Sequence, residues 1–349
     1  MFAIGAALCV MSAVTHYGDL GQVTAFVVAG GAIAVLALLV GLAVDQIAER
    51  LGAGATGVLQ SALGNLPELF IAIFALRQGL VTVVQAAIVG SILANLLLVL
   101  GLAFAAGGLR HGTQTFSTRR ASLITTSMVL AVGALVVPSL ASFVHTPASH
   151  HERALSVVTS VVLLVVFALS VPASVRRSEE ETTPGSGVPP AAEPAARWPV
   201  AVAVLVLAVT GVLAALVSDW FVSALTPAMA AVHISNTFAG LVIVAIAGNA
   251  VENVVGIQLA LRNQADHALS VILNSPLQIA LVLAPVIVLI SPLIGGAAFT
   301  LVFPPLLVVA LVIATIIIAV VILDGESNWL EGASLVGLYL VIAASFWWG

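Results

Sequence analysis

The chain has 349 residues, of which 61% are hydrophobic and only 7% are charged, and its formal net charge is −5. A soluble domain carries about 25% charged residues, so this chain cannot cover a water-facing surface, and we expect an all-α integral membrane protein. All ten basic residues are arginine, and nothing in their placement indicates nucleic acid as a partner. The single cysteine, Cys9, excludes an intrachain disulfide and a thiolate metal cage.

A helix that spans a membrane needs about 20 mostly apolar residues. Apolar runs between turn and charge clusters predict eleven helices, at 2–16, 21–44, 55–76, 81–106, 120–142, 154–175, 199–217, 235–261, 268–290, 299–323 and 329–348. The first run is short for a full crossing, but it has no basic n-region and no clear A-x-A site, so we expect a retained helix rather than a signal peptide. Residues 176–198 are rich in Pro, Gly, Ser and Glu and predict a flexible aqueous linker.

The two halves of the chain carry the same signature at a constant spacing. "GNLPE" begins at Gly64 and "GNAVEN" at Gly248, and the position pairs 64/248, 65/249, 68/252 and 91/275 all differ by 184. With the first run set aside, each half holds five predicted helices, and this odd number inverts the second copy in the membrane. Many secondary transporters have this inverted-repeat design. The predicted organisation is therefore an extra helix at 1–18, a first repeat at 19–175, a linker at 176–198 and a second repeat at 199–349.

The arginines predict the orientation. With eleven crossings, eight arginines fall on the side of the N-terminus, and only Arg77 and Arg153 fall on the other side. Because positive loops prefer the cytoplasm, we expect the N-terminus and the linker to be cytoplasmic and the C-terminus to be outside. A prokaryotic plasma (inner) membrane is the expected location.

Glu68 and Glu252 lie near the middle of their predicted spans. A charge there costs about 2.5–3.5 kcal/mol on insertion scales, and paying that cost twice at matching positions favours a function. Asn65 and Asn249 each precede a glutamate by three residues and so share its helix face. The alternative is a pair of protonated glutamates that hydrogen-bond between helices.

Further oxygen-bearing residues stand in the helices that follow. Ser91 and Asn95 are four residues apart, and Ser275 and Gln278 are three apart, so each pair points one way. Carboxylate, amide and hydroxyl oxygens suit a hard cation, above all Ca2+ with about 6–8 ligands, and the lack of Cys and His argues against a zinc-type site. We therefore expect a cation and proton site, with both glutamates as metal ligands. Ordinary interhelical hydrogen bonding is the alternative for the neutral residues.

Two prolines stand beside these residues. Pro67 and Pro276 each remove an N–H and free a carbonyl one turn earlier, on Leu63 and Ile272. We expect the proline to open the helix next to the acid, since irregular backbone is tolerated at a cavity. A simple kink is the alternative.

These motifs together resemble the calcium/proton exchanger family of the cation/Ca2+ exchanger superfamily. "GNLPELFIA" with "GSILANLLLVLG" is similar to that family's first repeat signature, and "GNAVEN" with "SPLQIAL" to its second. The resemblance implies that Glu68 and Glu252 bind the cation and exchange it for protons. It also implies that amide and hydroxyl groups help to line the site, at Asn65, Asn249, Ser91, Ser275 and Gln278. Asn253 stands where the family usually has histidine, and "LPE" is closer to the sodium/calcium branch, so the ion preference stays open.

Three weaker features complete the sequence. Asp45 and Asp219 are predicted at equivalent helix ends, where they could gather cations at the pathway mouths. The segment from His145 through His150 and His151 to Glu152 is predicted to be an exposed loop rather than a metal site. A solvated acidic loop is predicted around Asp324, Glu326 and Glu331.

The preferred function is an antiporter that exchanges Ca2+ or a related cation for protons by alternating access. A sodium/calcium or sodium/proton exchanger is the alternative within transport, and a passive cation channel is the alternative from another class. An enzyme is disfavoured, because the sequence has no H-E-x-x-H and no G-x-S-x-G motif. No cofactor is expected, since Ca2+ is the transported substrate, and the oligomeric state is not predicted.

Overall fold

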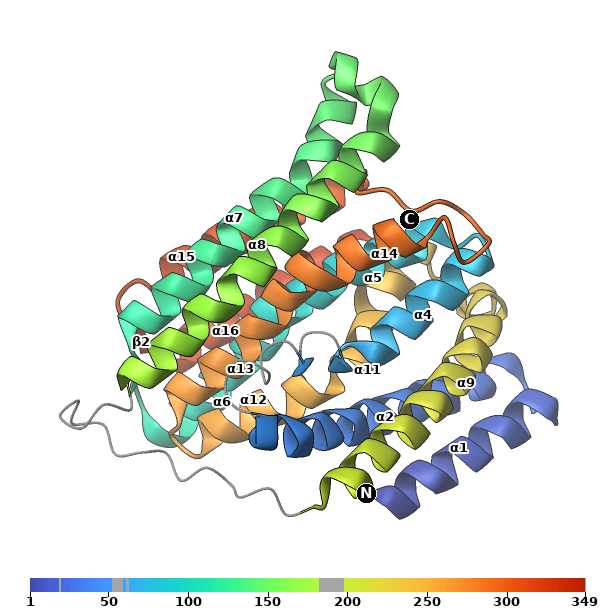
Figure 1. The fold of residues 1–349 in the computed structure, drawn as a ribbon, viewed down its shortest axis with the longest axis horizontal. Coiled ribbons are helices and arrows are strands. Elements are labelled where there is room, and N and C mark those ends of the chain that lie inside the picture. The colour runs from blue at the N-terminus through green and yellow to red at the C-terminus, as the bar shows by residue number, and fades with distance from the viewer. Residues whose placement is uncertain (19, 52–58, 61–62, 182–197, 349) are drawn as a thin grey trace.

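The computed structural model describes residues 1–18, 20–51, 59–60, 63–181 and 198–348. Within its helices it does not describe the side chains of residues 49, 51, 172–181 and 251–252. The predicted helical class is confirmed: Figure 1 shows a bundle of long helices. Among the described residues, six helices are long and apolar enough to cross a membrane, and a bent pair makes a seventh.

The first half of the chain forms helices that alternate in direction. Their order is α1 (Phe2–Tyr17), α2 (Gln22–Leu51), α4 (Leu66–Arg77), α5 (Val81–Leu93), the π-helix η1 (Ala94–Val99), α6 (Leu100–His111), α7 (Thr118–Phe143), the 3₁₀ turn η2 (Pro147–His151) and α8 (Glu152–Glu181). Segments α5, η1 and α6 follow one another without a gap. They therefore form one long rod.

The second half is also helical. Its elements are α9 (Val200–Val232), α10 (Asn236–Phe238), the π-helix η3 (Ala239–Val244), α11 (Ala245–Gly248), α12 (Ala250–Leu261), α13 (Ala265–Gln278), the π-helix η4 (Ile279–Leu283), α14 (Ala284–Ile290), α15 (Pro305–Val321) and α16 (Trp329–Ser345). One small feature was not predicted, since we expected helices alone. Strands β1 (Gln114–Thr115) and β2 (Glu326–Ser327) pair in antiparallel register and join two interhelical loops.

The two halves pack directly against each other. Helices α1, α2 and α9 form one group of neighbours, and α7, α8 and α15 form another, with α4 and α12 between them (Figure 1). In the first group Phe26 of α2 stacks on Phe221 of α9 with 4.6 Å between ring centroids. Helix α5 crosses η3 so closely that a Cβ at Gly90 would collide with the backbone of Leu241. Glycine is therefore required at this crossing.

Many outward-facing side chains are apolar, as expected of helices in lipid. Leu130 on α7 is 69% exposed and Leu205 on α9 is 62% exposed. A water-soluble protein rarely exposes such continuous apolar faces. This surface agrees with a chain that lies in a membrane.

Several predicted boundaries are wrong: α2, for example, ends at Leu51 and not at residue 44. Three others have a clear local reason. Helix α9 was expected to end at residue 217 but continues to Val232, because one aspartate does not break a helix. Helix α8 continues through residues 176–181 of the predicted linker. The charged residues Arg and Glu end an apolar run, but they are good helix formers and do not end a helix. The tenth helix begins at Pro305, not at residue 299, because a residue before proline is pushed out of the helical conformation. Residues 55–58 and 61–62 of the third predicted span and 182–197 of the linker lie outside the described part.

Candidate functional site

Each half contains a helix that begins abruptly at the signature asparagine. Asn65 precedes α4 with φ −95° and ψ 21°, and Asn249 precedes α12 with φ −91° and ψ 28°. The bend between residues 236–248 and 253–261 is 63°. Glu68 and Glu252 are the third residues of these half-helices. An N-terminus carries unpaired N–H groups and a partial positive charge, so it favours a carboxylate there.

A proline adjoins only one of these breaks. Pro67 stands in the first turn of α4, where proline fits a helix that has already begun. The break before α12 has the same geometry without any proline. Pro276 lies inside α13, which continues to Gln278, so the expectation that it opens the helix is wrong. The shared feature of both breaks is the Gly-Asn pair.

Wide helical turns accompany the site in both halves, and the sequence did not predict them. The π-helix η1 ends at Val99 and η4 ends at Leu283, and 283 − 99 gives 184, the spacing of the signatures. Such segments often mark functional sites in helices. Asn95 lies in η1 and Gln278 directly precedes η4, so both amides adjoin a widened turn.

Four predicted site residues form one buried hydrogen-bond network. Asn95 Nδ2 donates to Asn249 Oδ1 at 2.9 Å, and Asn249 Nδ2 donates to Ser91 Oγ at 2.9 Å. Ser275 Oγ donates to Asn249 Oδ1 at 3.2 Å. All four side chains are buried, with exposed fractions of 0–3%. The network therefore joins residues from both halves of the chain at one point in the core.

Glu68 meets the second signature directly. Its side chain is 7% exposed, and a Cβ added to Gly248 would lie 2.7 Å from Glu68 Cγ and 2.9 Å from Glu68 Oε1. The carboxylate of one signature thus rests on the glycine of the other. The side chain of Glu252 lies outside the described part, so only its position in the first turn of α12 is known.

Unsatisfied polar atoms surround this contact. Asn65 Nδ2 and Asn95 Oδ1 are buried and have no hydrogen-bond partner among the described residues. Leaving such a group buried costs about 1–3 kcal/mol. An oxygen such as Asn95 Oδ1 is a suitable ligand for a hard cation.

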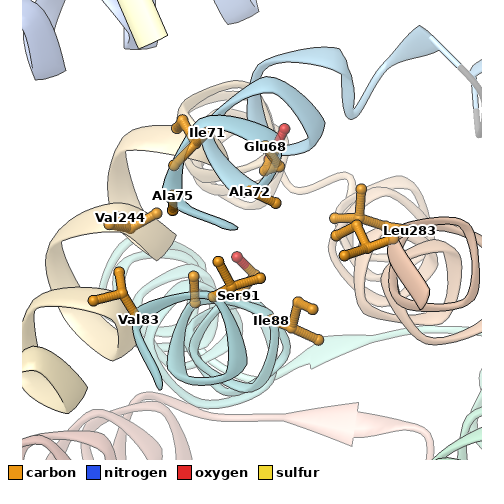
Figure 2. Close-up of a pocket in the computed structure, with 12 residues that line it drawn as sticks. Glu68, Ile71, Ala72, Ala75, Val83, Ile88, Ser91, Val244 and Leu283 are labelled. Carbon is orange, nitrogen blue, oxygen red and sulfur yellow. The ribbon is translucent and has the colours of Figure 1, made fainter. Parts of the chain in front are cut away.

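A narrow pocket lies against Glu68. Figure 2 shows Glu68 on one wall with Ile71 beside it, and Ser91 on the facing wall with Ile88 beside it. The cavity volume open to the centres of water molecules is about 20 Å³. One water needs about 10–15 Å³ by the same measure. The site can therefore hold water or a small ion, but not an organic substrate.

The other predicted residues are not among those that form the described hydrogen-bond network. Gln278 is half-buried at the end of α13 and is not part of the described network. Asp45 is exposed six residues before the end of α2, and Asp219 is half-buried thirteen residues before the end of α9. The expectation that these two acids occupy equivalent helix ends is therefore wrong, because α9 is longer than predicted.

The two segments that were predicted as loops, around His145–Glu152 and Asp324–Glu331, each lead directly into a helix. His145, His150 and Glu152 lie at the tip of the α7–α8 hairpin, and no three His, Cys, Asp or Glu side chains in the described part gather as a metal site. Glu331 caps α16 together with Asn328, whose Oδ1 accepts from the N–H of Glu331 at 3.0 Å. The N-x-x-E spacing is a capping box that could have been read from the sequence.

The arrangement offers oxygen ligands from two halves of the chain to one small cation. A carboxylate, amide oxygens and serine hydroxyls converge beside the paired breaks, and no Cys or His lies among the described residues that line the pocket. Ca2+ prefers this ligand chemistry. A buried carboxylate must be neutralised by a cation or by a proton, so this site can bind the two in exchange.

This chain is similar to known proteins over nearly its whole length. The family model described as sodium/calcium exchanger protein matches residues 21–175 and again residues 202–348. A Ca2+/H+ antiporter of Synechocystis sp. is 34% identical over 362 residues, covering 99% of this chain and 96% of that protein. The Ca2+/H+ antiporter ChaA of Bacillus subtilis is 32% identical, covering 99% of this chain and 97% of that protein. The solved structure of native YfkE is 31% identical with a TM-score of 0.83, covering 99% of each chain.

Proposed function

Because this chain belongs to the sodium/calcium exchanger protein family, we propose that it is a Ca2+/H+ antiporter, which moves Ca2+ across a membrane in exchange for protons. Relatives that carry this name align with the chain from end to end at 32–34% identity. The observation that carries the proposal within the structure is the contact between Glu68 of the first signature and Gly248 of the second. It brings an acid to the junction of two broken helices, as secondary transporters do.

The exchange follows from the need to neutralise buried acids. When Glu68 and Glu252 are both protonated, the site without a cation is neutral, so no net charge is buried. A divalent cation that binds the two carboxylates displaces both protons and again leaves the site nearly neutral. The site reorients only when it is neutral, because moving a bare charge through low dielectric is costly. Ser91, Ser275, Asn65, Asn95, Asn249 and Gln278 are proposed to supply further oxygen ligands or to orient them.

The membrane arrangement is proposed as eleven crossings, with α1 followed by two inverted repeats of five. Three observations support it: the family model matches twice, the breaks share one backbone geometry, and η1 and η4 end 184 residues apart. The arginine distribution supports a cytoplasmic N-terminus and linker, and an outer C-terminus. The bacterial relatives support the plasma membrane as its location.

A reconstituted vesicle tests this function. Purified protein in proteoliposomes with an acidic interior should take up Ca2+ from a more alkaline medium and should release acid as it does so. Collapse of the pH gradient should stop accumulation, and Na+ gradients should not replace it. Uptake that needs Na+ would favour the sodium/calcium exchanger, and uptake that equilibrates without any counter-ion would favour a channel.

A further inference from the structure

The solvent ends of α4 and α12 are each held by a loop from the other half of the chain. These are the two half-helices that carry Glu68 and Glu252. Residues 291–304 hold the end of α4, and residues 112–117 hold the end of α12. Figure 1 places these loops at opposite ends of the bundle. We call the two contacts the α4 clasp and the α12 clasp.

The α4 clasp joins α4 and α5 to the loop after α14. Ala297 N donates to Leu76 O at 3.2 Å, and Gln85 Nε2 donates to Val302 O at 2.6 Å. A Cβ at Gly296 would lie 2.6 Å from Leu76 O, so the loop approaches as closely as glycine allows. Gln85 is 8% exposed. Its amide is thus committed to this contact and not to water.

The loop of the α4 clasp is itself firmly anchored. Leu301 N donates to Ser156 Oγ at 3.0 Å, and Phe303 N donates to Ser139 Oγ at 2.9 Å. The alternating side chains Phe299, Leu301 and Phe303 are fully buried. The extended segment is therefore fixed to α7 and α8, and it can serve as a support for α4.

The α12 clasp joins α12 and α13 to the loop after α6. Gln114 Nε2 donates to Ala260 O at 3.0 Å and to Asn263 Oδ1 at 2.9 Å, and Ser117 N donates to Asp266 Oδ1 at 2.7 Å. Gln114 is only 2% exposed. A Cβ at Gly107 would collide with Gln114 Oε1, so the chain leaves space for this side chain.

The two clasps occupy matching places in the two halves. Their acceptor carbonyls are Leu76 and Ala260, and 260 − 76 gives 184, the spacing of the signatures. Their donors are Ala297 and Gln114, and 297 − 114 gives 183, one residue out of register. Both clasps therefore hold the same turn of the helix that carries a signature glutamate.

We propose that Gln85 and Gln114 are positioning residues for the exchange, and that each clasp bars access to the site from its own end until it is released. This inference rests on the proposed Ca2+/H+ exchange. The pocket at Glu68 is lined by Ala75, Val83 and Val84, which adjoin Leu76 and Gln85 of the α4 clasp. While the α4 clasp is intact, α4 keeps the pocket at Glu68 narrow. When the clasp is released, α4 can tilt and widen the pocket.

The test measures the KM for Ca2+ separately at each membrane face, in vesicles of both orientations. Gln85→Leu removes the amide of the α4 clasp and favours access from that end. It should lower the KM at that face about fivefold and raise it at the opposite face, since a hydrogen bond net contributes a factor of this order. Gln114→Leu should produce the mirror image. The control is Gln264→Leu, which changes an exposed glutamine beside the α12 clasp and should leave both values unchanged.

Opposite shifts at the two faces separate this role from a merely structural one. A variant that folds poorly lowers the amount of active protein, but it does not change the two KM values in opposite directions. Equal shifts at both faces, or no shift in either variant, would overturn the proposal. If the wild-type protein does not exchange Ca2+ for protons, the proposed function fails instead.

A reversible crosslink gives a second measurement. In a Cys9→Ser background, Arg77→Cys with Ala297→Cys places a thiol on each side of the α4 clasp. Exchange should proceed when the pair is reduced, stop in the crosslinked fraction, and return on reduction. A crosslinked protein that exchanges at the reduced rate would show that this clasp need not open, and the proposal would be wrong.

Discussion

Glu68 is the residue on which the proposed exchange depends. It is buried, stands in the first turn of α4 and touches Gly248 of the other half. A carboxylate in such a place is stable only with a cation, a proton or strong donors around it. Because Glu252 occupies the equivalent position by sequence spacing, the same role is proposed for both.

Glu68→Gln and Glu252→Gln should each abolish pH-driven Ca2+ flux while the protein remains folded. Glutamine keeps the volume of the side chain but can neither carry the exchanged proton nor offer a negative charge to Ca2+. The flux into proteoliposomes is measured beside a thermal unfolding curve for each variant. Near-normal flux in either variant would remove that glutamate from the exchange mechanism.

Gly248→Ala should impair exchange through Glu68 alone. The new Cβ would lie 2.7 Å from Glu68 Cγ, so the carboxylate must move, and overpacking of this kind costs about 1–3 kcal/mol. We expect a rise of about tenfold in the KM for Ca2+ by that estimate. Gly211→Ala in α9 is the control, since no atom lies within 4 Å of its added Cβ. Equal kinetics in the two variants would argue against a tight contact at Glu68.

Individual site residues could be chosen from the sequence, but their partners could not. The repeated signatures identified Asn249, Ser91 and Ser275 as one set, and the structure brings them together with Asn95. The bond between Asn95 and Asn249 spans 154 positions of the chain, and no local pattern encodes such a contact. Gln85 and Gln114 were missed because a lone glutamine in a helix or loop carries no motif.

At the scale of elements, the broken helices and the π-helices set the shape of the site. The breaks occur at Gly-Asn in both halves, and η1 and η4 end at matching positions. Apolar run length predicts where a helix crosses the membrane, but it is insensitive to a single changed turn. The sequence therefore located the helices well and their interruptions poorly.

Pro67→Ala tests which residue makes the break. Since α12 begins with the same backbone geometry and no proline, we expect the variant to exchange Ca2+ within about twofold of the wild type. Its stability should fall by less than about 1 kcal/mol, the usual effect of losing a proline at a compatible site. Loss of flux as complete as in Glu68→Gln would show instead that proline shapes the site.

At the scale of the whole molecule, the two halves form one site rather than two. Glu68 rests on the second signature, the amide network crosses between halves, and each clasp joins a loop of one half to a helix of the other. The sequence predicted the duplication from its constant spacing. It could not predict the interlocking, which depends on how the halves pack.

The orientation in the membrane can be tested in the linker. Ser186 lies outside the described residues, but the arginine distribution predicts that it is cytoplasmic. Ser186→Cys, after replacement of Cys9, should react only with thiol reagents that enter the cytoplasm. Arg153→Cys, on the predicted outer side, is the matched control and should react with impermeant reagents. Labelling of Ser186→Cys from outside intact cells would contradict the eleven-crossing arrangement.

The most direct test of the exchange counts protons against Ca2+ in the same proteoliposomes, with the membrane potential set by a K+ gradient and an ionophore. Two carboxylates that alternate between one Ca2+ and two protons give an electroneutral cycle. We therefore predict two protons released for each Ca2+ taken up, and a flux that is nearly unchanged by potential at a fixed pH gradient. A flux that follows the potential, or Na+-driven uptake of Ca2+ without a pH gradient, would contradict this account.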